Sequence, residues 1–238
     1  MGDISIIARR LEGGKYVQYG WSGNGGYFKA VGYRLLEYYN DPDKVEYLFG
    51  LGQLRLVGKP GSERGGESLM MTTHMTGEPH YLGKTEREIF SQIAFIDYGY
   101  FYDTDNVWYY VIPGPFRIKV PLEYIYNNVD DRGYEFDERN RIEEKLLRYI
   151  LGDYCKENEE FASLIGVNYS QGAQTILEEV LGDEYSIHFF WEKYHVLFNY
   201  LDDWVIVKTD EKKEKITGFI LHKNQEGEQE RVETIDWK

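Results

Sequence analysis

The sequence predicts an α+β protein, in which hairpins from the N- and C-terminal parts of the chain form a mixed or antiparallel sheet around an inserted acidic helical segment. Three observations support this prediction. Alternating apolar residues and turn signals dominate the first half, the period becomes helical from about residue 122, and alternation returns after residue 203. The expected parts are residues 1–121, 122–203 and 204–238, which together form one compact unit.

The first expected elements are a hairpin and two helices. Residues 3–10 and 15–21 alternate as strands around a glycine-containing turn. A glycine-rich loop then leads into residues 27–39, whose apolar side chains recur at helical spacing. Asp41 is the expected N-cap of the next short helix, with Pro42 at its first helical position.

Aromatic strands come next, and helices follow them. Residues 93–103 and 106–112 flank an Asp-Thr-Asp-Asn turn and predict a second hairpin. The remaining expected elements are strands at 69–75 and 116–121, helices at 137–154, 171–181 and 185–201, a hairpin of 204–209 with 216–222, and a strand at 231–237.

The negative charge is concentrated in the second half of the chain. Residues 1–121 carry 14 acidic and 13 basic side chains, whereas residues 122–238 carry 27 and 14. A one-sided acidic field repels nucleic acids and acidic membranes and attracts basic surfaces. We therefore expect a basic protein partner, with no direct binding to nucleic acid or membrane. No apolar run approaches the about 18–20 residues of a membrane span, which predicts a cytoplasmic protein.

The candidate partner-binding surface is a series of carboxylates in the helical segment. Residues 122–203 hold 19 acidic against 7 basic side chains. Such carboxylates either form a solvated helix face or lie where the phosphates of a nucleic acid would lie, and the sequence allows both interpretations. The candidate residues are Asp137, Glu138, Glu143, Glu144, Glu157, Glu159, Glu160, Glu178 and Glu179.

A possible metal site lies in the last expected helix. His188, Glu192 and His195 are spaced by four and three residues and fall on one helical stripe. From first to last they span about two turns, or about 10 Å, which is too far for both histidines to reach one ion. We therefore expect a polar helix flank at these positions, and no cofactor.

Further polar groups occur in loops and turns. His74, Glu78 and His80 are close in the sequence but match no metal-binding motif, and turn geometry alone explains Asp103 and Asp105. The glycine loop at residues 22–26 offers backbone amides for an anion but lacks the residues of a P-loop.

Two other residues have structural interpretations. Cys155 is the only cysteine of the chain, which excludes an internal disulfide, and it is expected to be an ordinary helix residue. Trp21 is expected to anchor the glycine loop against the first helix through Tyr38.

Residues 19–60 contain the segments YGW-SG and AVGYRLLEYYNDPDKVEYLFGLGQLRLVGKP. This pattern resembles a family of uncharacterised proteins from bacteriophages and integrated mobile elements, which have a tryptophan-rich hairpin followed by a helix. The aromatic hairpin at residues 98–110 is similar to the closing strands of that family. The chain departs from the family at Gly20, where the family has histidine, and at Ser22, where it has an acid. The matching positions are Trp21, Gly23, Gly32, Leu35, Leu36, Lys44, Val45, Leu51, Gly52 and Gly58.

These observations predict a non-enzymatic binding protein. The resemblance implies a phage or mobile-element setting, and the acidic surface implies a basic host protein as partner. The predicted mode of action is mimicry of a nucleic acid, which would inhibit a CRISPR or restriction nuclease of the host. The alternative prediction is a small metal-dependent hydrolase or nuclease that uses the histidines named above.

Overall fold

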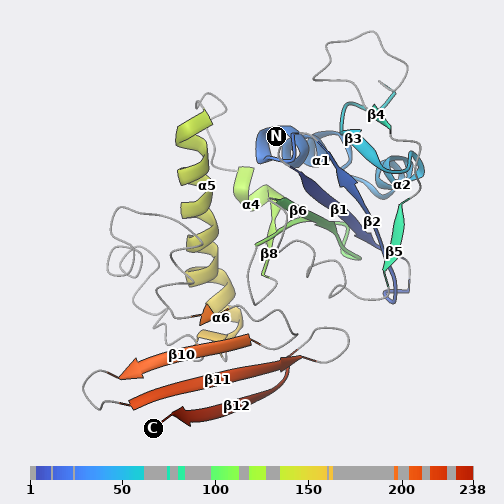
Figure 1. Ribbon diagram of the computed structural model, residues 1–238. Coiled ribbons are helices and arrows are strands. Elements are labelled where there is room, and N and C mark those ends of the chain that lie inside the picture. Colours follow the sequence, from blue (N-terminus) through green and yellow to red (C-terminus); the bar gives the residue numbers. More distant parts are fainter. Residues whose placement is uncertain are drawn as a thin grey trace. The chain divides into compact units, whose positions relative to one another are not determined.

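The structure of this protein is a computed structural model (Figure 1). The residues that it describes are 4–11, 13–23, 25–61, 74–75, 80–83, 98–112, 118–126, 135–159, 161–162, 196–197, 204–210, 215–223 and 229–237. Within 74–75, 135–141 and 196–237 only the backbone of these residues is described. The chain divides into two compact units, Met1–Pro113 with Lys119–Asn128, and Gly114–Ile118 with Val129–Lys238.

The first unit contains an open, mixed eight-stranded sheet with short helices. Its strand order is β4-β3-β2-β1-β6-β7-β8, and β5 also pairs with β2. The protein is therefore α+β, as the sequence predicts. The elements are β1 (Ser5–Arg10), β2 (Val17–Ser22), the π-helical turn η1 (Phe28–Gly32), α1 (Tyr33–Tyr38), α2 (Pro42–Gly50), β3 (Leu54–Leu56), β4 (His74–Met75), β5 (Tyr81–Gly83), β6 (Tyr98–Tyr102), β7 (Trp108–Val111), β8 (Lys119–Pro121) and α4 (Leu122–Tyr126).

Both hairpins of the first half are confirmed, and they meet through a parallel pairing. β1 and β2 are antiparallel, as are β6 and β7, while β1 pairs in parallel with β6. β2 and β3 are also parallel, and the helical segment η1–α1–α2 connects them. This connection brings the end of β2, the glycine loop and β3 together.

The two faces of the sheet are packed differently. One face carries the core cluster of Ile6, Ala8, Val17, Phe101 and Val111, which are at most 2% exposed. The alternate residues of β1 and β6 point to the opposite face, because side chains alternate along a strand. That opposite face is covered by the helices, as the following contacts show.

Phe28 of η1 packs on the aromatic rows of β6 and β7. Its ring centroid lies 5.5 Å from that of Tyr98, 6.3 Å from Tyr100 and 4.7 Å from Tyr110. Trp108 donates its indole N–H to the carbonyl oxygen of Tyr39, 2.6 Å away. Tyr100 combines both kinds of contact, since its ring is buried and its hydroxyl donates to the backbone carbonyl oxygen of Gly26 at 2.8 Å.

The start of α2 follows the sequence signal. Asp41 has extended backbone angles, and its carboxylate accepts a hydrogen bond from the backbone N–H of Lys44 at 3.0 Å. Pro42 is the first helical residue, where its missing N–H costs nothing. The predicted N-cap is therefore confirmed.

The second unit contains a helical stretch and a separate sheet. Its helical elements are contiguous along the chain, and the strand order of its four-stranded sheet is β12-β11-β10-β9. No helix in the described part of the chain is both long enough and apolar enough to cross a membrane. The elements are α5 (Glu135–Tyr149), the π-helical turn η3 (Ile150–Tyr154), α6 (Cys155–Glu157), β9 (Val196–Leu197), β10 (Trp204–Asp210), β11 (Lys215–Lys223) and β12 (Gln229–Trp237).

Two expectations about the second half are wrong. The C-terminal hairpin does not join the N-terminal sheet through any described strand, because β10–β12 pair with one another and with β9. Pairing between sequence neighbours needs only short loop closures, which favours this local sheet. The predicted helix at 185–201 does not extend over Val196–Leu197, which form a strand, and the predicted helix at 171–181 lies outside the described residues.

Gly32 offers a test of the packing between η1 and the sheet. A Cβ at this position would lie 2.7 Å from the hydroxyl oxygen of Tyr126 and 3.1 Å from the Tyr100 ring. Alanine normally stabilises a helix relative to glycine, by about 1 kcal/mol. We expect Gly32→Ala instead to lower the free energy of unfolding, by about 1–3 kcal/mol, because it overpacks this contact.

Chemical denaturation of Gly32→Ala and of a control, Gly50→Ala, checks this expectation. Nothing lies within 4 Å of a Cβ at Gly50 in α2, so that variant should be as stable as the wild type or more stable. The second change Tyr126→Phe removes the hydroxyl that the new methyl group would meet, and it should cost less in the Gly32→Ala background than in the wild type. A stabilised Gly32→Ala would contradict the packing described above.

Candidate functional site

The predicted acidic surface lies partly on the helical stretch of the second unit. Glu143 and Glu144 are half-buried, whereas Glu157 and Glu159 are exposed. Glu144 accepts a hydrogen bond from the guanidinium of Arg148 at 2.5 Å, one helical turn away. Glu144 therefore contributes less to an outward negative field than its sequence position suggests.

The charge of α5 is nearly balanced, since its sequence EFDERNRIEEKLLRY holds five acids and four bases. The candidates Asp137 and Glu138 belong to the part of α5 whose backbone alone is described. Glu160, Glu178 and Glu179 lie outside the described residues. The excess of negative charge in the helical segment therefore lies beyond α5.

Exposed carboxylates gather where the helical stretch ends. Asp153, Glu157 and Glu159 are exposed there, and Lys156 is the one basic residue between 150 and 159. The C-terminal end of a helix carries about half a negative charge from its backbone dipoles, so acids at this end increase the negative potential. Among the described candidate carboxylates, Glu157 and Glu159 at this end are exposed, whereas Glu143 and Glu144 of α5 are half-buried.

Asp103 holds three strands of the first unit together. Its carboxylate accepts hydrogen bonds from Arg10 of β1 at 2.7 Å and from Lys119 of β8 at 2.5 Å. The Lys119 ammonium also lies 5.3 Å from the ring centroids of Phe101 and Tyr109. Burial alone raises the pKa of Asp103, but the hydrogen bonds from Lys119 and Arg10 outweigh it and hold the pKa below its ordinary value of 3.8.

Both carboxylate oxygens of Asp105 also accept hydrogen bonds within the hairpin. One carboxylate oxygen accepts the hydroxyl proton of Tyr109 at 2.6 Å, and the other accepts the backbone N–H of Val107 at 3.1 Å. Asp103 and Asp105 therefore act in the hairpin turn and its ion pairs, which agrees with the turn interpretation. Their described partners give no support to a shared divalent ion.

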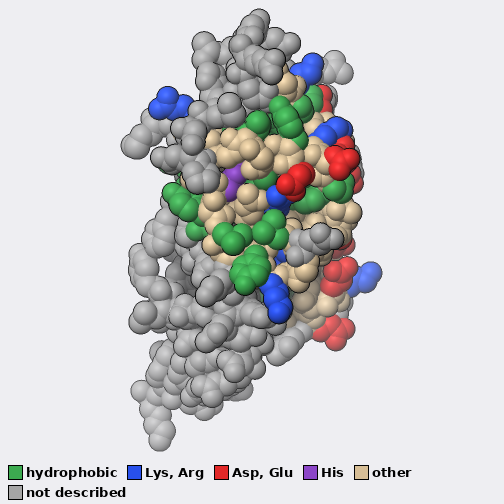
Figure 2. All heavy atoms as spheres, turned by 90° about the vertical axis from the view of Figure 1, so that its right-hand side faces the viewer, with side chains coloured by type: hydrophobic (Ala, Val, Ile, Leu, Met, Phe, Trp, Pro, Cys, Tyr) green, Lys and Arg blue, Asp and Glu red, His purple; other side chains and the backbone are tan. Residues whose placement is uncertain are grey.

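The structure places His80 in a packed environment. His80 precedes β5, and its ring lies 4.8 Å from that of Phe49 in α2. A Cβ at Gly20 of β2 would overlap with Cδ2 of His80 and lie 2.8 Å from its Nε2. The imidazole thus occupies the space that a side chain at position 20 would fill. On the face drawn in Figure 2, a small purple histidine patch is visible beside tan and green surface.

Hydrogen bonding determines the tautomer of His80. Its Nδ1 lies 3.1 Å from the carbonyl oxygen of Phe49, and since a carbonyl only accepts, Nδ1 carries the hydrogen. Burial lowers the pKa of His80 below 6.5, the Phe49 hydrogen bond raises it, and the positive charge of Arg9 lowers it again. The net effect is a lowered pKa, so the ring is neutral at pH 7.

The suggested grouping of His74, Glu78 and His80 is not established. His74 lies on β4, which pairs with β3, and its side chain is not among those described. Glu78 and the helical trio His188, Glu192 and His195 lie outside the described residues. Among the residues that are described, no group of three potential ligands is close enough to hold a metal ion.

Two tyrosine hydroxyls bind the backbone of the glycine loop and of the adjoining η1. Tyr100 donates its hydroxyl to the carbonyl oxygen of Gly26 at 2.8 Å, and Tyr126 donates to that of Phe28. Gly25 has a φ of 67°, which favours glycine, and its neighbour Asn24 is not described. This geometry explains the glycines structurally and does not identify a ligand.

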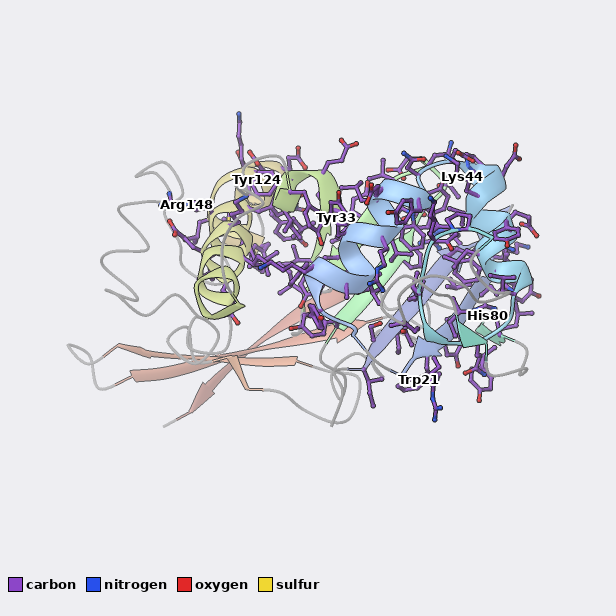
Figure 3. All side chains as sticks on the ribbon, turned by 90° about the horizontal axis from the view of Figure 1, so that it is seen from above. Trp21, Tyr33, Lys44, His80, Tyr124 and Arg148 are labelled. Carbon is purple, nitrogen blue, oxygen red and sulfur yellow. The ribbon has the colours of Figure 1, made fainter. Side chains whose placement is uncertain are left out.

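The expected role of Trp21 is wrong in its location. Trp21 packs against the core cluster around Phe101, on the face opposite the helices. Figure 3 shows Trp21 on the side of the sheet away from Tyr33 and Lys44. The prediction placed the Trp21 side chain on the wrong face of the sheet. A shift of one residue along a strand is enough to move a side chain to the other face.

Cys155 is a buried residue of α6, as expected for a structural cysteine. Burial raises the pKa of its thiol to about 12, so the thiolate needed for nucleophilic chemistry is essentially absent at neutral pH.

Comparison with known proteins gives no assignment. No family model matches the sequence, and no curated protein or solved structure matches it significantly.

The contact of His80 with Gly20 is the feature that sequence reasoning missed. A glycine inside a strand often marks the close approach of another group, and Gly20 lies within β2. This signal shows that something approaches the strand, but it does not say which residue, because His80 is 60 positions further along the chain.

Proposed function

We propose that this protein acts by binding a basic protein partner and has no catalytic activity of its own. The observation that carries the proposal is the division of charge, with 14 acids against 13 bases in residues 1–121 and 27 against 14 in residues 122–238. Further support comes from Asp103, Asp105 and Cys155, since fold contacts and burial account for each of them.

The partner class follows from the physics of charge and from the sequence resemblance. A basic channel that normally holds a nucleic acid attracts a protein that presents carboxylates. The resemblance to phage and mobile-element proteins favours a host nuclease, of the CRISPR or restriction type, in the cytoplasm. Inhibition would result from occupation of the nucleic-acid channel.

The proposal is tested at the end of the helical stretch, because Glu157 and Glu159 are exposed there. We expect the double change Glu157→Lys and Glu159→Lys to slow association with the partner about tenfold or more at low salt. At about 0.5 M salt the Debye length falls to about 4 Å, so the difference should shrink strongly. The partner is obtained by affinity capture from the native host and mass spectrometry, and its association rate is then measured by surface plasmon resonance.

A matched control changes the net charge by the same amount elsewhere. Glu37→Lys with Glu123→Lys alters two exposed acids of the first unit, and this variant should associate almost as fast as the wild type. Equal rates for both double variants at low salt would contradict an acidic binding surface at residues 157–159. A gel shift below micromolar concentration with DNA or RNA would contradict the predicted lack of nucleic-acid binding.

The metal-dependent hydrolase stays the alternative, but no described contact favours it. Stoichiometric zinc or iron in the purified protein, lost on His188→Ala, would replace the binding-protein proposal with this alternative.

A further inference from the structure

β5 is attached to the first sheet by a short ladder. Three residue pairs join it to β2, namely Val17 with Gly83, Gln18 with Leu82 and Tyr19 with Tyr81. The rings of Tyr19 and Tyr81 are 5.4 Å apart, yet Tyr81 is 48% exposed and Leu82 is 62% exposed. The strand itself therefore buries little apolar area, and additional side-chain contacts matter for its position.

His80, the residue directly before β5, makes such contacts. Its imidazole lies over the backbone of Gly20 in β2 and against the Phe49 ring in α2, and its Nδ1 donates to the Phe49 carbonyl oxygen. One side chain thus connects β5 to a neighbouring strand and to a helix.

The charged groups that face His80 are unevenly distributed. From β1, the guanidinium of Arg9 lies 4.8 Å from the Phe49 ring centroid and carries the charge that acts on His80. From α2, Glu46 is bound to Arg9 in an ion pair. Gly20 of β2 and Gln53, whose Cγ lies 3.4 Å from a Cβ at position 20, carry no charge.

We propose that His80 is an acid-sensitive latch, which holds β5 on β2 and α2 while the imidazole is neutral and releases it when the imidazole is protonated. This inference is independent of the proposed partner. It adds a conformational property to the first unit, which contains none of the candidate partner-binding carboxylates.

The physical reason is the positive charge that protonation creates, which no carboxylate among the described residues compensates. An imidazolium keeps its Nδ1–H, so the bond to Phe49 survives, but the new positive charge is half-buried beside Arg9. If Glu46 turned to the imidazolium, Arg9 would lose its carboxylate. Leaving the pocket and entering water is the less costly response, and β5 follows because His80 precedes it directly.

The sign of the pH dependence follows from the lowered pKa. The unfolded or detached state takes up a proton near pH 6.5, and the attached state does so only at lower pH. The contribution of neutral His80 to the stability of the attached state is therefore fully present above pH 6.5. This contribution is lost as the pH falls through the pKa of the attached state.

Hydrogen exchange of the full-length protein between pH 7.5 and 5, expressed as protection factors, tests the latch. We expect protection of the β5 amides to fall by at least about threefold, while that of Ile6 and Ile7 in β1 stays constant. In His80→Asn, whose amide keeps a donor near the Nδ1 position but does not titrate, the β5 protection should be independent of pH.

Arg9→Gln gives two further readouts, which distinguish the latch from a general loss of stability. Without the guanidinium the ring of His80 should titrate closer to 6.5 than in the wild type, because one cause of its lowered pKa is gone, and this is read from the ring resonances. The pKa gap between attached and detached states is then smaller, so β5 should lose less protection at each acidic pH.

Three results would overturn the proposal. The first is the same pH dependence of β5 protection in the wild type and in His80→Asn. The second is a parallel loss of protection in β1 and β5, which would indicate unfolding of the whole unit. The third is a His80 ring that titrates at or above 6.5 in the wild type.

Discussion

Phe101→Ala is expected to lower the free energy of unfolding of the first unit by about 3–5 kcal/mol, the usual cost of removing a fully buried phenylalanine ring. Phe101 is 0% exposed and belongs to the core cluster with Ile6 and Val111. The guanidinium carbon of Arg10 and the ammonium of Lys119 each lie 5.3 Å from its ring centroid. Truncation would therefore leave a cavity and remove two cation–π contacts.

Amide hydrogen exchange of β1 and β6 under increasing denaturant measures this loss for the first unit alone, which is necessary because the chain forms two units. Tyr16→Ala is the matched control, since Tyr16 is 46% exposed and should cost less than about 1 kcal/mol. A change below about 1 kcal/mol for Phe101→Ala would mean that the cluster around it is not the core of the sheet.

Asp103→Asn is expected to cost about 2–3 kcal/mol, although it removes only one charge. Loss of one partner from a fully buried ion pair typically costs about 3–5 kcal/mol, because the other charge remains uncompensated. The Asp103 side chain is 13% exposed and its partners Arg10 and Lys119 are 20% and 29% exposed, so water offsets part of this cost. Asp105→Asn keeps an acceptor oxygen in an exposed turn and should cost less than about 1 kcal/mol.

The pH dependence of Asp103→Asn provides a second measurement. The folded-state pKa of Asp103 lies below 3.8, so its contribution is fully present above 3.8 and is lost as the pH falls through the folded-state value. Unfolding free energies of wild type and variant should therefore converge in acid. A constant difference between neutral pH and strong acid would show that the Asp103 charge is not the cause.

Local features of the fold were predictable because their signals are local. The turn between β1 and β2, the N-cap at Asp41 and the Asp-rich turn before β7 each depend on a few adjacent residues. Hydrogen bonds from the backbone N–H groups of Thr104 and Val107 to Asp103 and Asp105 close that turn. Such contacts involve no long loop closure, so they follow directly from residue type and order.

Pairings between distant segments could not be predicted in the same way. The parallel ladder of β1 and β6 aligns Ser5 with Tyr98, and the contact of His80 with Gly20 joins positions that no sequence period relates. Several strand orders satisfy the same pattern of alternation. The choice among them depends on the side-chain packing of the two faces, as the location of Trp21 shows.

The features of the candidate site also fall into those that the sequence alone determines and those that depend on the fold. The sequence alone establishes how many carboxylates the second half carries and excludes an internal disulfide. The spacing of Glu144 and Arg148, four residues apart in a helix, already favours their ion pair. The sequence does not show that Glu157 is exposed, since this depends on which face of the helix is packed.

By itself, then, the sequence determined the α+β class, the hairpins and caps, and the concentration of negative charge after residue 121. Only the tertiary structure decided that β10–β12 form a sheet with β9 and not with β1, and that His80 occupies the space above Gly20. The physical reason is that composition and local hydrogen bonding are properties of short segments. Pairing, burial and pKa values arise from groups that the folded chain brings together from far apart.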